Sequence, residues 1–160
     1  MVVVMEFESI FEKYWDKIYR LCMAYLNDQD LAKDLAQDTM IKIWEQLPKF
    51  REESNIGTWI YKIASNNCLR QIEKSKRSER VEFPENLITE ESNSQLEDNI
   101  KLLYQYISEL NELDRIIISL ELEELPQSEI AIITGLSESN VRVKIHRIKE
   151  RLSKKFNNGK

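Results

Sequence analysis

Residues 127–152 read QSEIAIITGLSESNVRVKIHRIKERL, and this stretch decides how the C-terminal part of the chain folds. Ala131, Gly135 and Val141 stand four and then six residues apart in it. A small alanine lets two helices cross closely, a glycine adopts the left-handed conformation that closes a turn, and a valine anchors the second helix to the core. The spacing therefore predicts two helices joined by a tight turn, a helix-turn-helix motif.

The second helix of this motif combines an apolar stripe with a basic surface. Ser137 or Ser139 is expected to cap it. Apolar residues at helical spacing place one side against the core: Val141, Ile145, Ile148 and Leu152. Two outward lines carry polar and basic residues: Asn140, Lys144, Arg147 and Arg151 on one, and Arg142, His146 and Lys149 on the other. Such a helix suits the major groove of DNA, where Arg and Asn pair with base edges and Lys neutralises phosphate. The alternative is a helical hairpin with a solvated basic face.

The remainder of the chain favours an all-α fold. Its 160 residues include only three Gly and three Pro, the residues that punctuate hairpins and strand turns. Three N-terminal segments have apolar residues at helical steps. The first contains Phe7, Ile10, Phe11, Tyr14, Ile18, Leu21, Cys22 and Tyr25. The second, from about Leu31 to Leu47, turns inward Leu35, Ala36, Met40, Ile43, Trp44 and Leu47. The third is expected to start with Thr58 as N-cap and to bury Ile60, Ile63, Ala64 and Leu69.

These patterns divide the chain into two small helical domains and a linker. We expect the first domain over residues 6–78 and the second over 99–156, where apolar stripes contain Ile100, Leu103, Tyr104, Ile107 and Leu110, then Leu113, Ile117 and Leu120. Residues 79–98 hold few large apolar groups, too little to offset the entropy of ordering. The sequence therefore predicts a flexible linker between the domains.

The charge pattern separates the same three parts. The net charge is −5, which by itself argues against a nucleic-acid partner. Residues 62–80 nevertheless carry six Lys and Arg against two Glu, and residues 140–160 carry eight against one. Residues 81–98 carry six Asp and Glu with no Lys or Arg. Two basic regions thus flank an acidic linker.

Other classes of function find little support. Cys22 and Cys68 lie far apart, without metal-knuckle spacing or an obvious bridging role, and suggest a reducing compartment. The opening MVVVMEFESIF lacks the basic flank and the length of a signal or membrane segment, so we expect a cytoplasmic protein that does not insert into membranes. His146 is the single histidine, and there is no Gly-rich phosphate loop. We therefore expect no cofactor, no bound metal and no enzymatic activity.

Two long stretches resemble one protein family. Residues 34–77, DLAQDTMIKIWEQLPKFREESNIGTWIYKIASNNCLRQIEKSKR, resemble the second conserved region of sigma factors of the extracytoplasmic-function (ECF) group of the sigma-70 family. Residues 110–152 resemble the fourth region of the same factors. The resemblance implies a region 2 helical bundle and a region 4 helix-turn-helix. It also implies that the protein binds core RNA polymerase, recognises the minus-35 and minus-10 promoter elements and assists promoter melting. A stand-alone helix-turn-helix regulator is the alternative.

The resemblance also assigns surfaces. The helix matching DLAQDTMIKIW docks on the clamp coiled coil of the polymerase beta-prime subunit, with contacts from Asp34, Gln37, Asp38, Ile41, Trp44 and Glu45. The beta flap is a further expected contact on the polymerase, and an anti-sigma factor is an expected inhibitor. The minus-10 element is expected to meet Arg51, Ser54, Asn55, Ile56, Thr58, Trp59, Tyr61, Lys62, Asn66, Asn67 and Arg70. Some of these residues, Trp59 and Tyr61 in particular, have packing in the core as an equal alternative.

The minus-35 element is expected to meet the basic helix of the helix-turn-helix. The residues concerned are Ser139, Asn140, Arg142, Val143, Lys144, His146, Arg147 and Arg151. The match departs from the family at Ser128, where an aromatic residue is common, and at Asn140 and Val143, where Thr and Ser are frequent. Glu121 stands where some relatives have an arginine that holds DNA. These departures leave the minus-35 bases undetermined.

Overall fold

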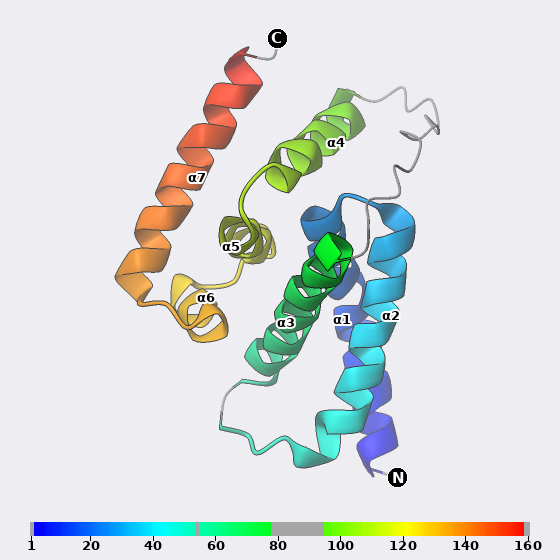
Figure 1. The fold of residues 1–160 in the computed structure, drawn as a ribbon. Coiled ribbons are helices and arrows are strands. Elements are labelled where there is room, and N and C mark those ends of the chain that lie inside the picture. The colour runs from blue at the N-terminus through cyan, green and yellow to red at the C-terminus, as the bar shows by residue number, and fades with distance from the viewer. Residues whose placement is uncertain (1, 54, 78–94, 159–160) are drawn as a thin grey trace.

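The computed structural model describes residues 2–53, 55–77 and 95–158, and α-helices dominate this part of the chain (Figure 1). In order, they are α1 (Val2–Leu26), α2 (Gln29–Gln46), α3 (Ile56–Arg77), α4 (Gln95–Ser108), α5 (Glu112–Leu122), α6 (Gln127–Thr134) and α7 (Glu138–Asn158). A single 3-10 turn, Leu47–Lys49, follows α2. The described residues contain no strand, and the prediction of an all-α fold is confirmed.

Helices α1, α2 and α3 form a bundle. Asp28 caps α2, because its carboxylate accepts a hydrogen bond of 3.0 Å from the Leu31 backbone N–H. The helix therefore starts two residues before the predicted Leu31. Large side chains from all three helices are fully buried, including Ile18, Tyr25, Ile43 and Ile60. Trp44 is an exception, since it was predicted to point inward and is 41% exposed.

Helix α3 begins differently from the prediction. Asn55, not Thr58, is the capping residue, since its side-chain oxygen accepts a hydrogen bond of 2.9 Å from the Gly57 N–H. Thr58 lies inside the first turn and is 3% exposed. Gly57 itself packs against α1, where a Cβ atom would come within 2.9 Å of the Tyr14 hydroxyl. The start of α3 is thus fixed by a cap on one side and a close helix contact on the other.

Helices α4 to α7 form the second domain, and the helix-turn-helix prediction is confirmed in detail. Gly135 ends α6 with φ 78°, the left-handed conformation, and its N–H donates to the Ala131 carbonyl. The Ser137 hydroxyl accepts a hydrogen bond of 3.2 Å from the Asn140 N–H, so Ser137 caps α7. Val141 and Ile130 of α6 are both fully buried in the core.

Helix α4 begins at Gln95, inside the range 79–98 that the sequence assigned to the linker. Residues 78–94 lie outside the described residues, and the prediction of a flexible linker is not tested there. Within α4, Ile100 was expected on an apolar stripe but is 42% exposed, whereas Ile107 is fully buried. The C-terminal half of α4 is therefore the part that packs into the core.

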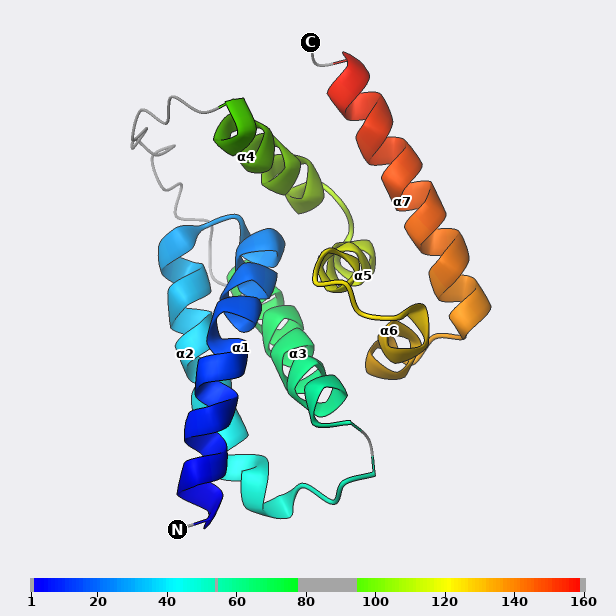
Figure 2. The ribbon, with the colours of Figure 1, turned by 180° about the vertical axis from the view of Figure 1, so that it is seen from behind.

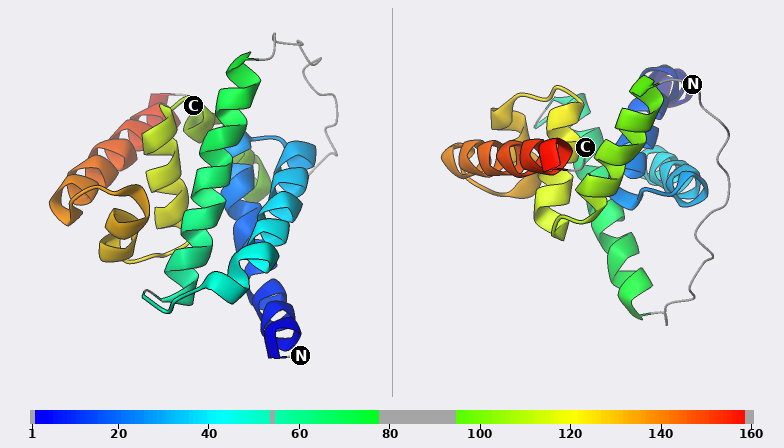
Figure 3. Two further views of the ribbon diagram at one scale, coloured as in Figure 1. Left: turned by 60° about the horizontal axis from the view of Figure 1, so that its bottom comes forward. Right: turned by 90° about the horizontal axis from the view of Figure 1, so that it is seen from above.

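The two domains contact one another. Helix α1 packs on α4 and α5, and α3 packs on α6. Figures 2 and 3 show α5 and α6 on the side of α3 opposite to α2. The Arg20 guanidinium of α1 donates two hydrogen bonds of 3.0 Å to the Glu123 carboxylate, which follows α5. Arg115 of α5 donates a hydrogen bond of 3.2 Å to the Tyr25 carbonyl at the end of α1 and lies over the Tyr25 ring.

Candidate nucleic-acid and polymerase interfaces

Helix α7 presents the predicted minus-35 residues on its outer side. In Figures 1 and 2 it lies at the edge of the molecule farthest from the bundle of α1, α2 and α3. The exposed members of the set are Ser139, Asn140, Arg142, Val143, His146, Arg147 and Arg151. Lys144 is the exception, because its ammonium lies 3.8 Å from the Asp114 carboxylate and its side chain is 30% exposed. The exposed helix of a helix-turn-helix is the element that enters the major groove.

The residues predicted to meet the minus-10 element fall into two groups. Ser54 lies outside the described residues. The accessible group lies on the loop before α3 and on one side of that helix: Arg51, Asn55, Lys62, Asn66 and Arg70 are exposed, and Ile56 and Trp59 are half-buried. Lys62, Asn66 and Arg70 stand four residues apart and form one line along α3. Trp59 rests on Phe50 at a ring-centroid distance of 4.8 Å, so one ring packs the loop onto the helix.

The second group, Thr58, Tyr61 and Asn67, is buried in this conformation. Tyr61 is 5% exposed and meets Tyr14 edge to face, with ring centroids 6.2 Å apart. Burial raises the pKa of the Tyr61 hydroxyl, and the Glu123 carboxylate of the second domain raises it further. Tyr61 therefore packs where the two domains meet.

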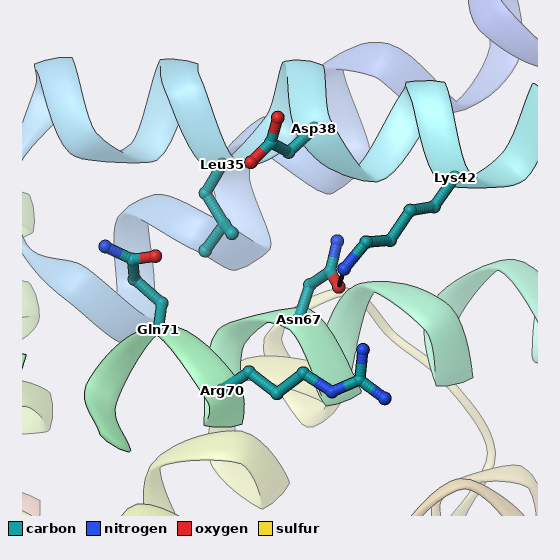
Figure 4. Close-up of a pocket in the computed structure, with 6 residues that line it drawn as sticks. All are labelled: Leu35, Asp38, Lys42, Asn67, Arg70 and Gln71. Carbon is teal, nitrogen blue, oxygen red and sulfur yellow. Dashed lines mark hydrogen bonds between the residues drawn. The ribbon is translucent and has the colours of Figure 1, made fainter. Parts of the chain in front are cut away.

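Asn67 belongs to a hydrogen-bond chain between α2 and α3. Lys42 Nζ donates to Asn67 Oδ1 at 2.6 Å, and Asn67 Nδ2 donates to Thr39 Oγ1 at 3.1 Å. Thr39 Oγ1 donates in turn to the Leu35 carbonyl at 2.8 Å. Figure 4 shows the small pocket beside this chain, which Leu35, Asp38, Lys42, Asn67, Arg70 and Gln71 line. Because both the oxygen and the nitrogen of the buried Asn67 amide are hydrogen-bonded, this side chain holds α2 and α3 in register.

All six residues predicted to dock on polymerase are exposed on α2: Asp34, Gln37, Asp38, Ile41, Trp44 and Glu45. Ile41 is 54% exposed and so offers apolar surface to a partner. The Trp44 ring meets Phe7 of α1 edge to face, with centroids 5.0 Å apart. Acidic groups around an apolar and aromatic centre are typical of a protein interface.

No motif in the sequence predicted the contacts between the domains. Arg20 and Glu123 are 103 residues apart, and neither stands in a motif. The Glu123 side chain is 8% exposed although it carries a charge, and Arg20 is its salt-bridge partner. A buried carboxylate needs such a partner, but the sequence does not reveal which acidic residue is buried.

Cys22 and Cys68 lie together, which their separation in sequence did not indicate. Both are buried free thiols, and their sulfur atoms are 4.0 Å apart between α1 and α3. The hydrogen bond with Cys22, together with burial, holds the pKa of the Cys68 thiol well above its usual range. The pair is therefore a neutral, apolar contact inside the bundle.

Two kinds of site are absent from the part of the chain that the structure describes. No three His, Cys, Asp or Glu side chains are grouped so that they could hold a metal ion. None of the helices combines the length and the apolar character that a membrane span requires. The described residues do present two exposed surfaces, a basic one on α7 and an acidic one with an apolar centre on α2. A helix-turn-helix with an exposed basic second helix is typical of DNA-binding proteins.

Comparison with known proteins identifies the family within this class. Residues 10–78 match the family model of sigma-70 region 2, and residues 100–152 match that of sigma-70 region 4. RNA polymerase sigma factor YlaC of Bacillus subtilis is 30% identical over 155 residues, which cover 92% of this chain and 90% of YlaC. The ECF sigma factor SigM of the same bacterium is 26% identical over 97% of this chain and 98% of its own length.

Solved structures agree on the fold. The sigma factor RpoE of Bartonella quintana, in complex with the anti-sigma factor NepR, superposes with a TM-score of 0.78 and 21% identity over 95% of this chain and 97% of its own. CnrH, in complex with the cytosolic domain of CnrY, gives a TM-score of 0.74 and 18% identity over 96% of this chain and 89% of CnrH.

The chain belongs to the ECF group of the sigma-70 family of RNA polymerase sigma factors. It binds core RNA polymerase and promoter DNA and directs promoter-specific initiation of transcription. The family is not enzymatic, so the polymerisation chemistry belongs to the polymerase. The alternative of a stand-alone helix-turn-helix regulator is not supported, because residues 10–78 match sigma-70 region 2.

Proposed function

We propose that the two domains divide promoter recognition between them. Residues 99–156 bind the duplex minus-35 element through α7, with Ser139, Asn140, Arg142, Val143, His146, Arg147 and Arg151 toward the DNA. Residues 6–78 dock on the beta-prime clamp coiled coil through the exposed face of α2. The same domain holds the opened minus-10 element. The observation that carries this division is that each domain has its own exposed polar surface, the outer side of α7 in the second domain and the line of Lys62, Asn66 and Arg70 on α3 in the first.

For the minus-10 element, the proposal rests on the accessible group of residues. Lys62, Asn66 and Arg70 line up along α3, and an amide between two cations can hydrogen-bond a base edge while the cations follow the phosphates. Asn55, Ile56 and Trp59 lie at the start of the helix, where an unstacked base needs an apolar wall and a polar partner. Thr58, Tyr61 and Asn67 are buried and act from inside, by holding α3 in place.

Promoter binding requires the two domains to move apart. B-DNA rises about 3.4 Å per base pair, so elements centred about 25 base pairs apart are separated by about 85 Å. Helices α3 and α6 contact one another here, so α7 and the polar line of α3 cannot reach both elements at once. Docking on polymerase, including the beta flap, supplies the free energy for this separation.

We propose further that an anti-sigma factor controls this chain and that it acts in the cytoplasm. The support for the first is that RpoE, whose fold it shares, was solved in complex with the anti-sigma factor NepR. The support for the second is that core polymerase works in that compartment.

Run-off transcription with reconstituted core polymerase on a random promoter library tests the function. Selected templates should share a minus-35 and a minus-10 element. On such a promoter, Arg147→Ala should weaken closed-complex formation by about 1–3 kcal/mol if Arg147 pairs with a base. Replacing Asn55 and Trp59 should reduce strand opening, measured by permanganate footprinting, and leave duplex binding nearly intact. If both changes impaired duplex binding equally and a pre-melted promoter rescued neither, the division would be wrong.

A further inference from the structure

The basic side chains of α7 differ in whether they form ion pairs within the second domain. Lys149 Nζ lies 3.0 Å from Glu121 Oε1, and Lys144 Nζ lies 3.8 Å from Asp114 Oδ1. Both acidic residues belong to α5, Asp114 in its first turn and Glu121 in its last. Arg142, Arg147 and Arg151 are exposed on the same helix, and no ion pair holds them among the described residues. Two lysines of the DNA-binding helix are thus neutralised by their own domain, while three arginines are open to solvent.

The positions of the two lysines explain why they are paired. Each helical residue advances the direction of the side chain by about 100°. Lys144 and Lys149 therefore flank the buried stripe of α7 on opposite sides, next to α5, which packs against it. The arginines lie farther round the helix, toward solvent. The lysines are within reach both of α5 and of a DNA backbone at the edge of the groove.

The Glu121–Lys149 pair is weak as a source of stability, because exposed ion pairs contribute little. The Lys149 side chain is 58% exposed, and that of Glu121 is 22% exposed. Its effect on DNA is larger, for two reasons. An ammonium bound to a carboxylate does not neutralise a phosphate, and the carboxylate itself repels the phosphate backbone.

We propose that Glu121 limits the affinity of the second domain for duplex DNA by holding Lys149 away from the backbone phosphates, and that Asp114 acts likewise on Lys144. The inference rests on the proposed entry of α7 into the major groove. Its consequence is that recognition depends on the three arginines, while non-specific attraction to phosphate is held down. A DNA-binding domain tuned in this way needs the polymerase to keep it on a promoter.

Glu121 is the better position for a test. Asp114 also accepts a hydrogen bond of 3.1 Å from Asn111 at the start of α5, so replacing it would disturb a helix cap. The test is a double-mutant cycle in the full chain with Glu121→Gln, Lys149→Gln and the pair of changes together. Affinity for a short random-sequence duplex is measured by fluorescence anisotropy across a range of salt concentrations.

Glu121→Gln should raise the affinity, and Lys149→Gln should lower it less in the wild type than in the Glu121→Gln background. If the freed Lys149 makes one additional phosphate contact in Glu121→Gln, raising the salt from about 50 to 200 mM should reduce the affinity of this variant by roughly 3.5-fold more than that of the wild type. Lys149→Gln in the Glu121→Gln background should remove that increment. Equal effects of Lys149→Gln in both backgrounds would overturn the proposal.

Glu124→Gln is the matched control. Glu124 follows the same helix, is exposed and has no ion-pair partner among the described residues, so its replacement changes the charge equally without releasing a lysine. It should show no coupling to Lys149→Gln, and coupling as large as that of Glu121 would also overturn the proposal. Arg147→Ala distinguishes a failure of the proposed DNA-binding role of α7 from a failure of the proposed role of Glu121. If Arg147→Ala leaves the affinity for a duplex with the selected minus-35 element unchanged, α7 is not the DNA-binding helix and the proposed function fails. If it weakens binding while the cycle shows no coupling, only the role of Glu121 is refuted.

Discussion

Replacing Arg20 with Ala should loosen the contact between the two domains. The Arg20 guanidinium and the Glu123 carboxylate form a two-bond ion pair, with both hydrogen bonds at 3.0 Å. Glu123 also lies near Tyr61 and Tyr104, and burial and then the Glu123 carboxylate raise the pKa of both hydroxyls. Without Arg20, a carboxylate that is 8% exposed stays among these aromatic side chains with no cation beside it.

The size of the effect follows from this geometry. Hydrogen bonds to charged groups are worth about 1.5–3 kcal/mol. The Arg20 side chain is 50% exposed, so solvent screens part of the interaction and lowers the expected loss to about 1–2 kcal/mol. A loss of about 1–2 kcal/mol shifts the equilibrium between packed and separated domains by roughly 5- to 30-fold.

Small-angle X-ray scattering of the free chain measures this shift. The radius of gyration should increase in Arg20→Ala relative to the wild type, and affinity for core polymerase should rise, because less free energy is needed to separate the domains. Lys33→Ala is the matched control, since Lys33 is an exposed cation of α2 without a partner among the described residues. If Arg20→Ala scattered like the wild type at equal stability, the ion pair would not hold the domains together.

Three other predictions concern the first domain. Replacing Asp38 and Ile41 together should weaken capture of core polymerase in a pull-down while the helical circular dichroism signal stays unchanged, because both side chains are exposed. Asn67→Ala should lower the free energy of unfolding in urea by about 1–3 kcal/mol, since it leaves buried hydrogen bonds unmade. Asn66→Ala, on the exposed side, should stay within about 0.5 kcal/mol of the wild type and impair promoter opening instead. For Tyr61, the folded-state pKa is raised, so its contribution to stability is present below the ordinary tyrosine pKa of about 10 and is lost as the pH rises above it. Urea unfolding of wild type and Tyr61→Phe between about pH 9 and pH 11 should show a larger loss in the wild type than in the variant, which keeps only the contribution of Tyr104.

The sequence predicted those parts of the fold that depend on local chemistry. Gly135 ends α6 and Ser137 caps α7 because turn and cap geometries are made by neighbouring residues. The cap of α3 was misplaced to Thr58 because Asn and Thr are both common N-cap residues, and the sequence does not show which of Asn55 and Thr58 precedes the first turn. The Arg20–Glu123 pair was beyond prediction, because nothing local distinguishes one acidic residue from another until tertiary packing buries it.

On α3, the family resemblance located the DNA-binding helix but did not distinguish its exposed residues from its buried ones. It marked Asn66 and Asn67 alike, although adjacent residues point about 100° apart on a helix. A helix packed between α2 and α6 has room for DNA along only part of its circumference. Asn66 shares the exposed line with Lys62 and Arg70, whereas Asn67 shares the buried side with Ala64 and Cys68. The bundle thus uses one asparagine to set the position of α3 through Thr39 and Lys42, and it leaves the other at the surface where DNA can reach it.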